Sequence, residues 1–179
     1  RRQRQMCIRD RACTDLGAAK EAGVGVAEDA EAAMRAYRRG CELDDGRGCI
    51  ALALLQSDPP DQNLLERGTR RLSSACDAGD AAACGALGRV YQAGIGFAVD
   101  LNQAKALYER GCSGGDAEAC LALGEVHRDA APETARTHYL RACDLGYLHA
   151  CSQLGFDHLT GVIGDDAAEG AVWLKRACD

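Results

Sequence analysis

The sequence predicts an all-α solenoid of about five antiparallel helix pairs, stapled by disulfide bonds. Three observations lead to this prediction: the chain repeats at a period near 35 residues, each repeat carries two stretches of apolar residues at helical spacing, and cysteines recur at matching positions. Of the 179 residues, 47% are hydrophobic but only 4% are aromatic. A core with few aromatic rings suits close helix contacts made by alanine and glycine, and each pair is stabilised by stacking on its neighbours.

Two interleaved series of cysteines define the repeat. Each member of the first series follows an alanine or a glycine and precedes a leucine by three residues. Each member of the second series follows a tyrosine or a leucine by four residues. The intervals within each series lie between 31 and 36 residues. The first series is Cys13, Cys49, Cys84, Cys120 and Cys151, and the second is Cys41, Cys76, Cys112, Cys143 and Cys178. One period shared by two series predicts a repeat of two elements.

Both elements have the pattern of helices. In the third repeat, Ala83, Leu87, Val90 and Tyr91 fall at positions i, i+4, i+7 and i+8, which is the apolar stripe of a helix with one buried face. The second repeat replaces a glycine loop with residues 57–61, and the fourth is about one helical turn shorter near residues 130–132. In chain order, we expect the repeats at about 12–42, 47–77, 81–112, 117–143 and 148–178.

Helix ends are marked by short carboxylates and by glycines. Asp80, Asp100 and Asp116 each stand before a helical segment, where an aspartate side chain accepts hydrogen bonds from free backbone N–H groups. Gly94 and Gly96 follow a helix, where the backbone commonly becomes left-handed. These residues predict the turns between antiparallel helices.

Residues 1–11 differ from the rest of the chain. They read RRQRQMCIRDR, a basic stretch without the repeat pattern. Residues 6–11 match what a transposon end used in sequencing libraries would encode, so we interpret 1–11 as a non-native read-through segment. A genuine basic arm is the alternative. Without the five arginines and one aspartate of this stretch, the net charge changes from −6 to −10, and such an acidic body is not expected to bind nucleic acid.

The two cysteine series pair with one another at constant spacing. In four places a cysteine of the second series is followed eight residues later by one of the first series. A turn between two helices brings such residues within the Cα separation that a disulfide requires, so we predict the bonds Cys41–Cys49, Cys76–Cys84, Cys112–Cys120 and Cys143–Cys151. A zinc site is the weaker alternative because the pairs lie one repeat apart and do not converge. We expect no metal and no cofactor.

Two cysteines lack a partner in this register. The partner of Cys13 would be position 5, where Gln5 stands, and that of Cys178 would be position 186. The array is therefore expected to be truncated at both ends, with any signal peptide lost alongside the N-terminal part. His127, His138, His149 and His158 are not spaced as metal ligands, and we interpret them as ordinary surface or half-buried residues.

The repeat resembles the Sel-one-like repeat family, a relative of the tetratricopeptide repeat, and within it the Helicobacter cysteine-rich protein type. The matching residues are Ala83-Cys84, Leu87-Gly88, Tyr91, Gly94, Gly96, Asp100, Lys105-Ala106, Tyr108, Cys112 and Ser113 to Asp116. The resemblance implies a right-handed superhelix, a periplasmic or secreted location, and action through protein contacts. It also implies an alternative, because some members are described as penicillin-binding proteins or β-lactamases.

The residues themselves do not support a catalytic site. A serine β-lactamase needs a lysine three residues after its serine, and no serine in the chain has that neighbour. We therefore expect a non-catalytic scaffold that binds a protein or peptide, acts as a monomer and has no membrane span, with a β-lactamase-type hydrolase as the alternative.

A variable stripe on the first helix of each pair is the candidate binding surface. Positions five and eight after the cysteine share a face away from the Leu-Gly contact, and their residues differ from repeat to repeat. We expect a concave binding face formed by Arg89, Gln92, Glu125, Arg128, Phe156 and Leu159. Simple solvent exposure predicts the same variation.

Overall fold

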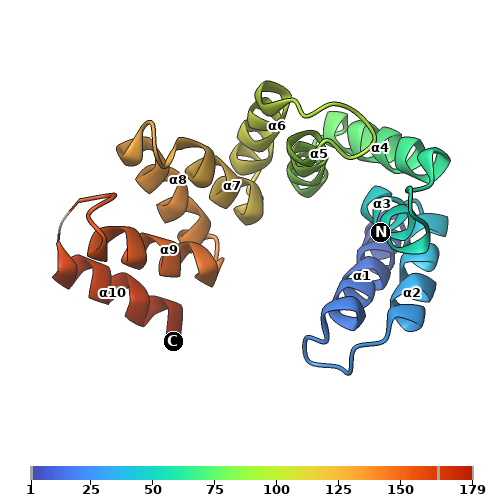
Figure 1. Cartoon of the computed structure of the whole chain (residues 1–179), viewed down its shortest axis with the longest axis horizontal. Coiled ribbons are helices and arrows are strands. Elements are labelled where there is room, and N and C mark those ends of the chain that lie inside the picture. Colours follow the sequence, from blue (N-terminus) through green and yellow to red (C-terminus); the bar gives the residue numbers. More distant parts are fainter. Residues whose placement is uncertain (1, 165, 179) are drawn as a thin grey trace. The chain divides into compact units, whose positions relative to one another are not determined.

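The computed structural model describes the backbone of residues 2–164 and 166–178, and the side chains of residues 11–164 and 166–178. Every regular element in this described part is an α-helix, which confirms the all-α prediction. Figure 1 shows the helices in chain order. They are α1 Arg2–Ala22, α2 Ala30–Glu42, α3 Gly46–Gln56, α4 Gln62–Asp77, α5 Ala81–Ala93, α6 Leu101–Ser113, α7 Ala117–His127, α8 Pro132–Asp144, α9 Leu148–Leu159 and α10 Ala167–Cys178.

The chain forms two compact units. The first contains the helices up to Ala78 together with the short segment Gly94–Ala98, and the second contains Gly79–Ala93 and the chain from Val99 onward. Within the first unit α1 packs on α2, α2 on α3, and α3 on α4. Within the second unit α5 packs on α6, α6 on α7, α7 on α8, α8 on α9, and α9 on α10. Each unit is thus a stack of neighbouring antiparallel helices, the packing that a solenoid requires.

The predicted helix ends are found, with one difference. The Asp80 and Asp100 carboxylates accept from backbone N–H groups three residues later, at 3.2 Å and 2.9 Å. Asp116 occupies the N-cap position of α7, but its side chain makes no capping hydrogen bond. Gly94 and Gly96 have positive φ angles of 65° and 84°, as predicted. Burial raises the pKa of Asp116, because charge is costly in a partly desolvated position.

The tight turn after each second helix needs a left-handed residue. Gly79, Gly115 and Gly146 supply it with φ values of 90°, 95° and 88°. In the first unit Asp44 takes the equivalent place with φ 70°, and its carboxylate pairs with Arg71 at 2.8 Å. A non-glycine residue therefore adopts this conformation where an arginine of the next helix pair binds its side chain.

In the first, third and fourth pairs, the core is built on contact between a glycine of the first helix and a tyrosine ring of the second. In the fourth pair, a Cβ atom placed on Gly124 of α7 would lie 2.2 Å from the Tyr139 ring of α8. In the third pair, Gly88 meets Tyr108 in the same way, at 2.6 Å. Tyr108 and Tyr139 are among the largest fully buried side chains. The Leu-Gly motif of one series and the tyrosine of the other are therefore two halves of one contact.

Candidate functional site

Five residues of the predicted binding face lie on α5, α7 and α9, and Arg128 directly follows α7; all six are in the second unit. Helix α5 contacts α7 directly, and Arg128 at the end of α7 reaches Asp157 of α9. The first helices of three successive pairs are thus connected in sequence, α5 to α7 and α7 to α9. The six residues differ in their contacts and in their exposure to solvent.

Arg89, Gln92 and Glu125 surround a small hollow. Arg89 forms an ion pair with Glu118 of α7, and the Tyr108 hydroxyl donates a hydrogen bond to the Gln92 side chain. The hollow has a volume of about 130 Å³. It is lined by Arg89, Gln92, Tyr108, Glu118, Leu121, Ala122, Glu125 and Tyr147. The partial burial of Tyr147 raises the pKa of its hydroxyl, so it stays a neutral hydrogen-bond donor at physiological pH.

Arg128 has a structural role that the sequence pattern did not indicate. Its Nε donates to both carboxylate oxygens of Asp157, at 3.0 Å and 3.1 Å, and Gln153 donates to the same carboxylate at 3.0 Å. The Asp157 side chain is 0% exposed, and that of Arg128 is 30% exposed. The Asp157 contact raises the pKa of Arg128, and the guanidinium is engaged in neutralising a buried charge.

Glu125, Phe156 and Leu159 remain turned to solvent. Phe156 is 53% exposed and Leu159 is 51% exposed, although both are large apolar residues on one helix. Glu125 lies at the hollow described above and is exposed as well. Of the six predicted residues, these three present the side chains that a partner could contact without displacing an internal interaction.

Ion pairs between first helices recur in both units. In the first unit, Arg47 of α3 pairs with Asp15 of α1 at 3.3 Å. In the second unit, Arg89 pairs with Glu118, and Arg128 pairs with Asp157. All three pairs connect one repeat to the next, and the two in the second unit involve Arg89 and Arg128 of the face that was predicted to bind a partner. Sequence periodicity could not reveal them because the partners do not share one position in the repeat.

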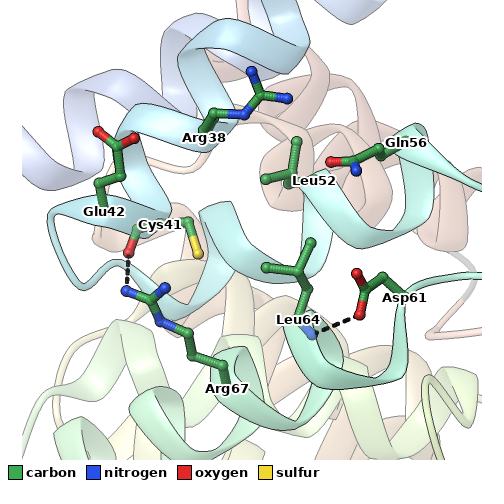
Figure 2. A pocket seen from close by; sticks show the side chains of 8 residues that line it. All are labelled: Arg38, Cys41, Glu42, Leu52, Gln56, Asp61, Leu64 and Arg67. Carbon is green, nitrogen blue, oxygen red and sulfur yellow. Dashed lines mark hydrogen bonds between the residues drawn. The ribbon is translucent and has the colours of Figure 1, made fainter.

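A larger pocket lies in the first unit and was not predicted. It has a volume of about 350 Å³ and is formed by side chains of α2, α3 and α4 (Figure 2). Leu52 and Leu64 point into it from α3 and α4, while Arg38 and Glu42 reach its edge from α2 (Figure 2). Its residues come from three helices at unrelated positions of the repeat. No stripe on a single helix could have indicated it.

Cysteine pairs join the second helix of one repeat to the first helix of the next. The bonds Cys41–Cys49 and Cys112–Cys120 have Cα separations of 4.5 Å, and Cys143–Cys151 has one of 5.0 Å. Cys76 and Cys84 are disulfide-bonded as well. Cys13 and Cys178 are free thiols, of which Cys178 is exposed. The solenoid is therefore disulfide-stapled, as the sequence predicted.

His158 is buried, whereas all four histidines were interpreted from the sequence as surface or half-buried residues. His158 is 4% exposed, and neither of its ring nitrogens has a hydrogen-bond partner in the described part of the chain. Its Nε2 lies 3.7 Å from the Glu169 carboxylate, which also accepts from Arg136 at 2.8 Å. His158 is buried because the loop at Gly164 and helix α10 both cover it. Residue type alone gave no signal for this.

A profile of the Sel1 repeat matches residues 10–45, 81–116, 117–147 and 148–179, which is most of the chain. The chain belongs to the Sel1 repeat family. Residues 1–9 and 46–80 are unmatched, and 46–80 contains the second repeat, whose glycine loop is replaced. Sel1 repeat proteins are in general non-catalytic scaffolds that mediate protein interactions. No curated protein matches this Sel1 repeat chain.

Several solved structures have the same fold as this chain. A Sel1 repeat protein from Oxalobacter formigenes is 25% identical with a TM-score of 0.62, and the match covers 94% of this chain and 72% of that one. Cysteine-rich protein B from Helicobacter pylori is 28% identical with a TM-score of 0.51, covering 71% and 96%. An immunity protein from Pseudomonas aeruginosa, 18% identical with a TM-score of 0.65, covers 94% and 67% and shares the fold.

Within the described residues of this Sel1 repeat chain, no helix is both long and apolar enough to cross a membrane. The same residues contain no group of three or more His, Cys, Asp or Glu side chains placed to hold a metal ion. Ser73 and Ser74 lie in the C-terminal half of α4, a helix that packs on α3.

Proposed function

We propose that this Sel1 repeat chain is a non-catalytic scaffold that binds a protein or peptide on the face formed by α5, α7 and α9. The observation that carries the proposal is that some residues of this face make internal contacts while others are exposed and without such contacts among the described residues. Arg89, Gln92 and Arg128 make internal contacts that join neighbouring helices, whereas Phe156 and Leu159 of α9 expose apolar surface. Exposed apolar side chains on a face whose polar residues are held by internal contacts are typical of a protein-binding surface.

The chemistry of the face suggests the chemistry of the partner. Phe156 and Leu159 would accept apolar side chains, because covering them removes apolar surface from water. Glu125 at the hollow would favour a basic side chain, and the Tyr147 hydroxyl offers a hydrogen bond. We therefore expect a partner segment that carries a lysine or arginine near two apolar residues.

Peptide selection tests the proposed face. The oxidised full chain is used to select binders from a random peptide display library, and affinities of the enriched peptides are measured by fluorescence anisotropy. We expect Phe156→Ala and Leu159→Ala to weaken binding by about tenfold or more, because central apolar anchors dominate such interfaces. Leu101→Ala on α6, where Leu101 is 62% exposed, is the matched control and should bind as the unmodified chain does. Equal losses from the control would contradict the proposed face.

We also propose a periplasmic or secreted location for this protein. Stable disulfides form in oxidising compartments and are rare in a reducing cytosol, and Cys41, Cys49, Cys112, Cys120, Cys143 and Cys151 are all bonded in pairs. A non-reducing peptide map of protein exported to an oxidising compartment should recover the joined peptides, including the Cys76–Cys84 pair. Free thiols at all four pairs under these conditions would contradict the proposed location.

The scaffold proposal also predicts the outcome of an activity assay. Purified protein at high concentration should not hydrolyse a chromogenic cephalosporin, because Ser73 and Ser74 lack the lysine neighbour that a serine β-lactamase uses. Turnover that co-purifies with the protein and is absent from a mock preparation would favour the hydrolase alternative.

A further inference from the structure

The pocket of the first unit combines an apolar floor with charged groups at its edge. Leu52 is 4% exposed and Leu64 is half-buried, and both point into the space that Figure 2 shows. The volume of about 350 Å³ lies within the range of small-molecule sites in proteins. Arg38, Glu42 and Arg67 stand around this floor (Figure 2).

Most of the charged groups around the pocket already have partners. Glu42 pairs with Arg39 at 3.1 Å, outside the pocket. Arg67 donates to the Cys41 carbonyl at 3.0 Å. The remaining acid, Asp61, accepts from the backbone N–H groups of residues 63 and 64 at 2.9 Å and 3.2 Å, as the N-cap of α4.

Arg38 is the exception. Among the side chains that the structure describes, none forms a hydrogen bond or an ion pair with its guanidinium, which Figure 2 shows at the pocket edge above Leu52. A guanidinium presents several N–H donors in one plane and binds a carboxylate through two of them. Counting only partners among the described side chains, the pocket therefore offers one free cation, Arg38, next to a leucine floor.

We propose that this pocket binds an aliphatic carboxylate, with the carboxylate on Arg38 and the hydrocarbon on Leu52 and Leu64. The site lies in the first unit and does not depend on the protein-binding face of the second. Two sources share this chemistry: a free aliphatic acid, and the C-terminal residue of a peptide that ends in an apolar side chain. Each of them carries a carboxylate next to a hydrocarbon.

The test uses the oxidised full chain with leucine methyl groups labelled for NMR. Hexanoate is titrated and compared with hexanamide, which has the same hydrocarbon and no charge. We expect saturable shifts of the Leu52 and Leu64 methyl signals, and an affinity for hexanoate about tenfold above that for hexanamide. Equal binding of the two compounds, or shifts that do not saturate, would overturn the proposal.

Variants on one helix separate the role of Arg38 from general charge. Arg38→Gln should weaken hexanoate binding by about tenfold, while Arg35→Gln should not, because Arg35 lies outside the pocket and pairs with Glu31 at 3.6 Å. Glu42→Gln should tighten binding, since it removes a carboxylate one helical turn from Arg38. Loss of binding in Arg35→Gln equal to that in Arg38→Gln would overturn the proposal.

A further titration distinguishes the two sources. N-acetyl-leucine presents the end of a peptide, and N-acetyl-leucinamide is its uncharged counterpart. Tighter binding of N-acetyl-leucine than of hexanoate assigns the site to a peptide C-terminus, and the reverse order assigns it to a free acid. If none of these compounds binds the pocket, the peptide selection on the second unit is unaffected, so the two proposals can fail independently.

Discussion

Arg89 and Arg128 show how burial decides the role of a residue. Each forms an ion pair with a carboxylate on the next first helix. The partner of Arg89, Glu118, has a side chain that is 46% exposed, whereas Asp157 is 0% exposed. Water therefore screens the first pair, but the second carboxylate depends on Arg128 for compensation of its charge.

We predict that Arg128→Gln lowers the free energy of unfolding by about 3 kcal/mol, because it leaves the Asp157 carboxylate buried without its cation. Urea denaturation followed by circular dichroism measures this. The matched change Arg89→Gln should cost less than about 1 kcal/mol, because its partner is exposed. The double variant Arg128→Gln/Asp157→Asn should recover much of the loss. A cost for Arg128→Gln no larger than that for Arg89→Gln would contradict this account.

His138 makes the stability of the chain depend on pH. Its ring stacks on His127 with centroids 5.7 Å apart. Burial lowers the pKa of His138, and its electrostatic interaction with the neighbouring His127 ring acts in the same direction. Arg141 and Lys105 also lower it, and Glu109 raises it. The unfolded chain therefore binds a proton at a higher pH than the folded chain does.

We therefore predict that the contribution of neutral His138 to the unfolding free energy is fully present above the ordinary histidine pKa of about 6.5. This contribution is lost as the pH falls through the lowered pKa of His138. The variant His138→Gln should reduce the decline in unfolding free energy between pH 7 and pH 5. Parallel denaturant titrations at several pH values provide the measurement. An unchanged slope in the variant would show that other groups govern the acid response.

At the scale of helices, four of the five pairs have a glycine of the first helix in contact with a tyrosine or a leucine of the second. Gly124 and Tyr139 show it in the fourth pair, where no room exists for a Cβ atom. The second pair has Ala53 and Leu72 at the same positions, and both are buried. Ala53 is larger than glycine and Leu72 is smaller than tyrosine, so the two differences compensate each other in volume.

We predict that Gly124→Ala lowers the unfolding free energy by about 1–3 kcal/mol, because its methyl group overlaps the Tyr139 ring. The double variant Gly124→Ala/Tyr139→Leu, which reproduces the pair Ala53 and Leu72, should be more stable than the sum of the single changes implies. A double-mutant cycle in urea measures the coupling. Additive effects within error would contradict the predicted contact.

At the scale of the whole molecule, stability is a sum of contacts between neighbours. Within each unit the helices pack chiefly on those next to them in the chain, and disulfides join one repeat to the following one. Each bond closes a loop of about nine residues, to which the chain-entropy model assigns roughly 2–3 kcal/mol. Local damage is therefore expected to stay local.

We predict that Cys143→Ala/Cys151→Ala lowers hydrogen-exchange protection in α8, α9 and α10 and leaves α2 and α3 unchanged. The reason is that the lost bond joins only α8 to α9, and neighbouring contacts carry the remaining stability. Cys178→Ala, at an exposed free thiol, is the control and should not alter protection. A uniform loss of protection along the whole chain would show that the repeats unfold as one cooperative unit.

The sequence predicted the regular features because they depend on local spacing. Helix pairs follow from apolar residues at helical intervals, and cysteine partners follow from a turn that places residues eight apart within bonding distance. Asp80 and Asp100 act on backbone groups three residues away, and so they could be recognised without tertiary information. Asp116 shows the limit of such local prediction. It stands at the N-cap position of α7, but its side chain makes no capping hydrogen bond.

By itself, the sequence determined the all-α class, the repeat register and the disulfide-stapled arrangement of this Sel1 repeat chain. Only the tertiary structure decided that Arg128 neutralises a buried aspartate, that His158 is buried, and that α2, α3 and α4 enclose a pocket beside Arg38. The physical reason is that these features depend on how neighbouring helices rotate and stack against one another. That geometry results from packing over the whole contact, and no interval along a single helix encodes it.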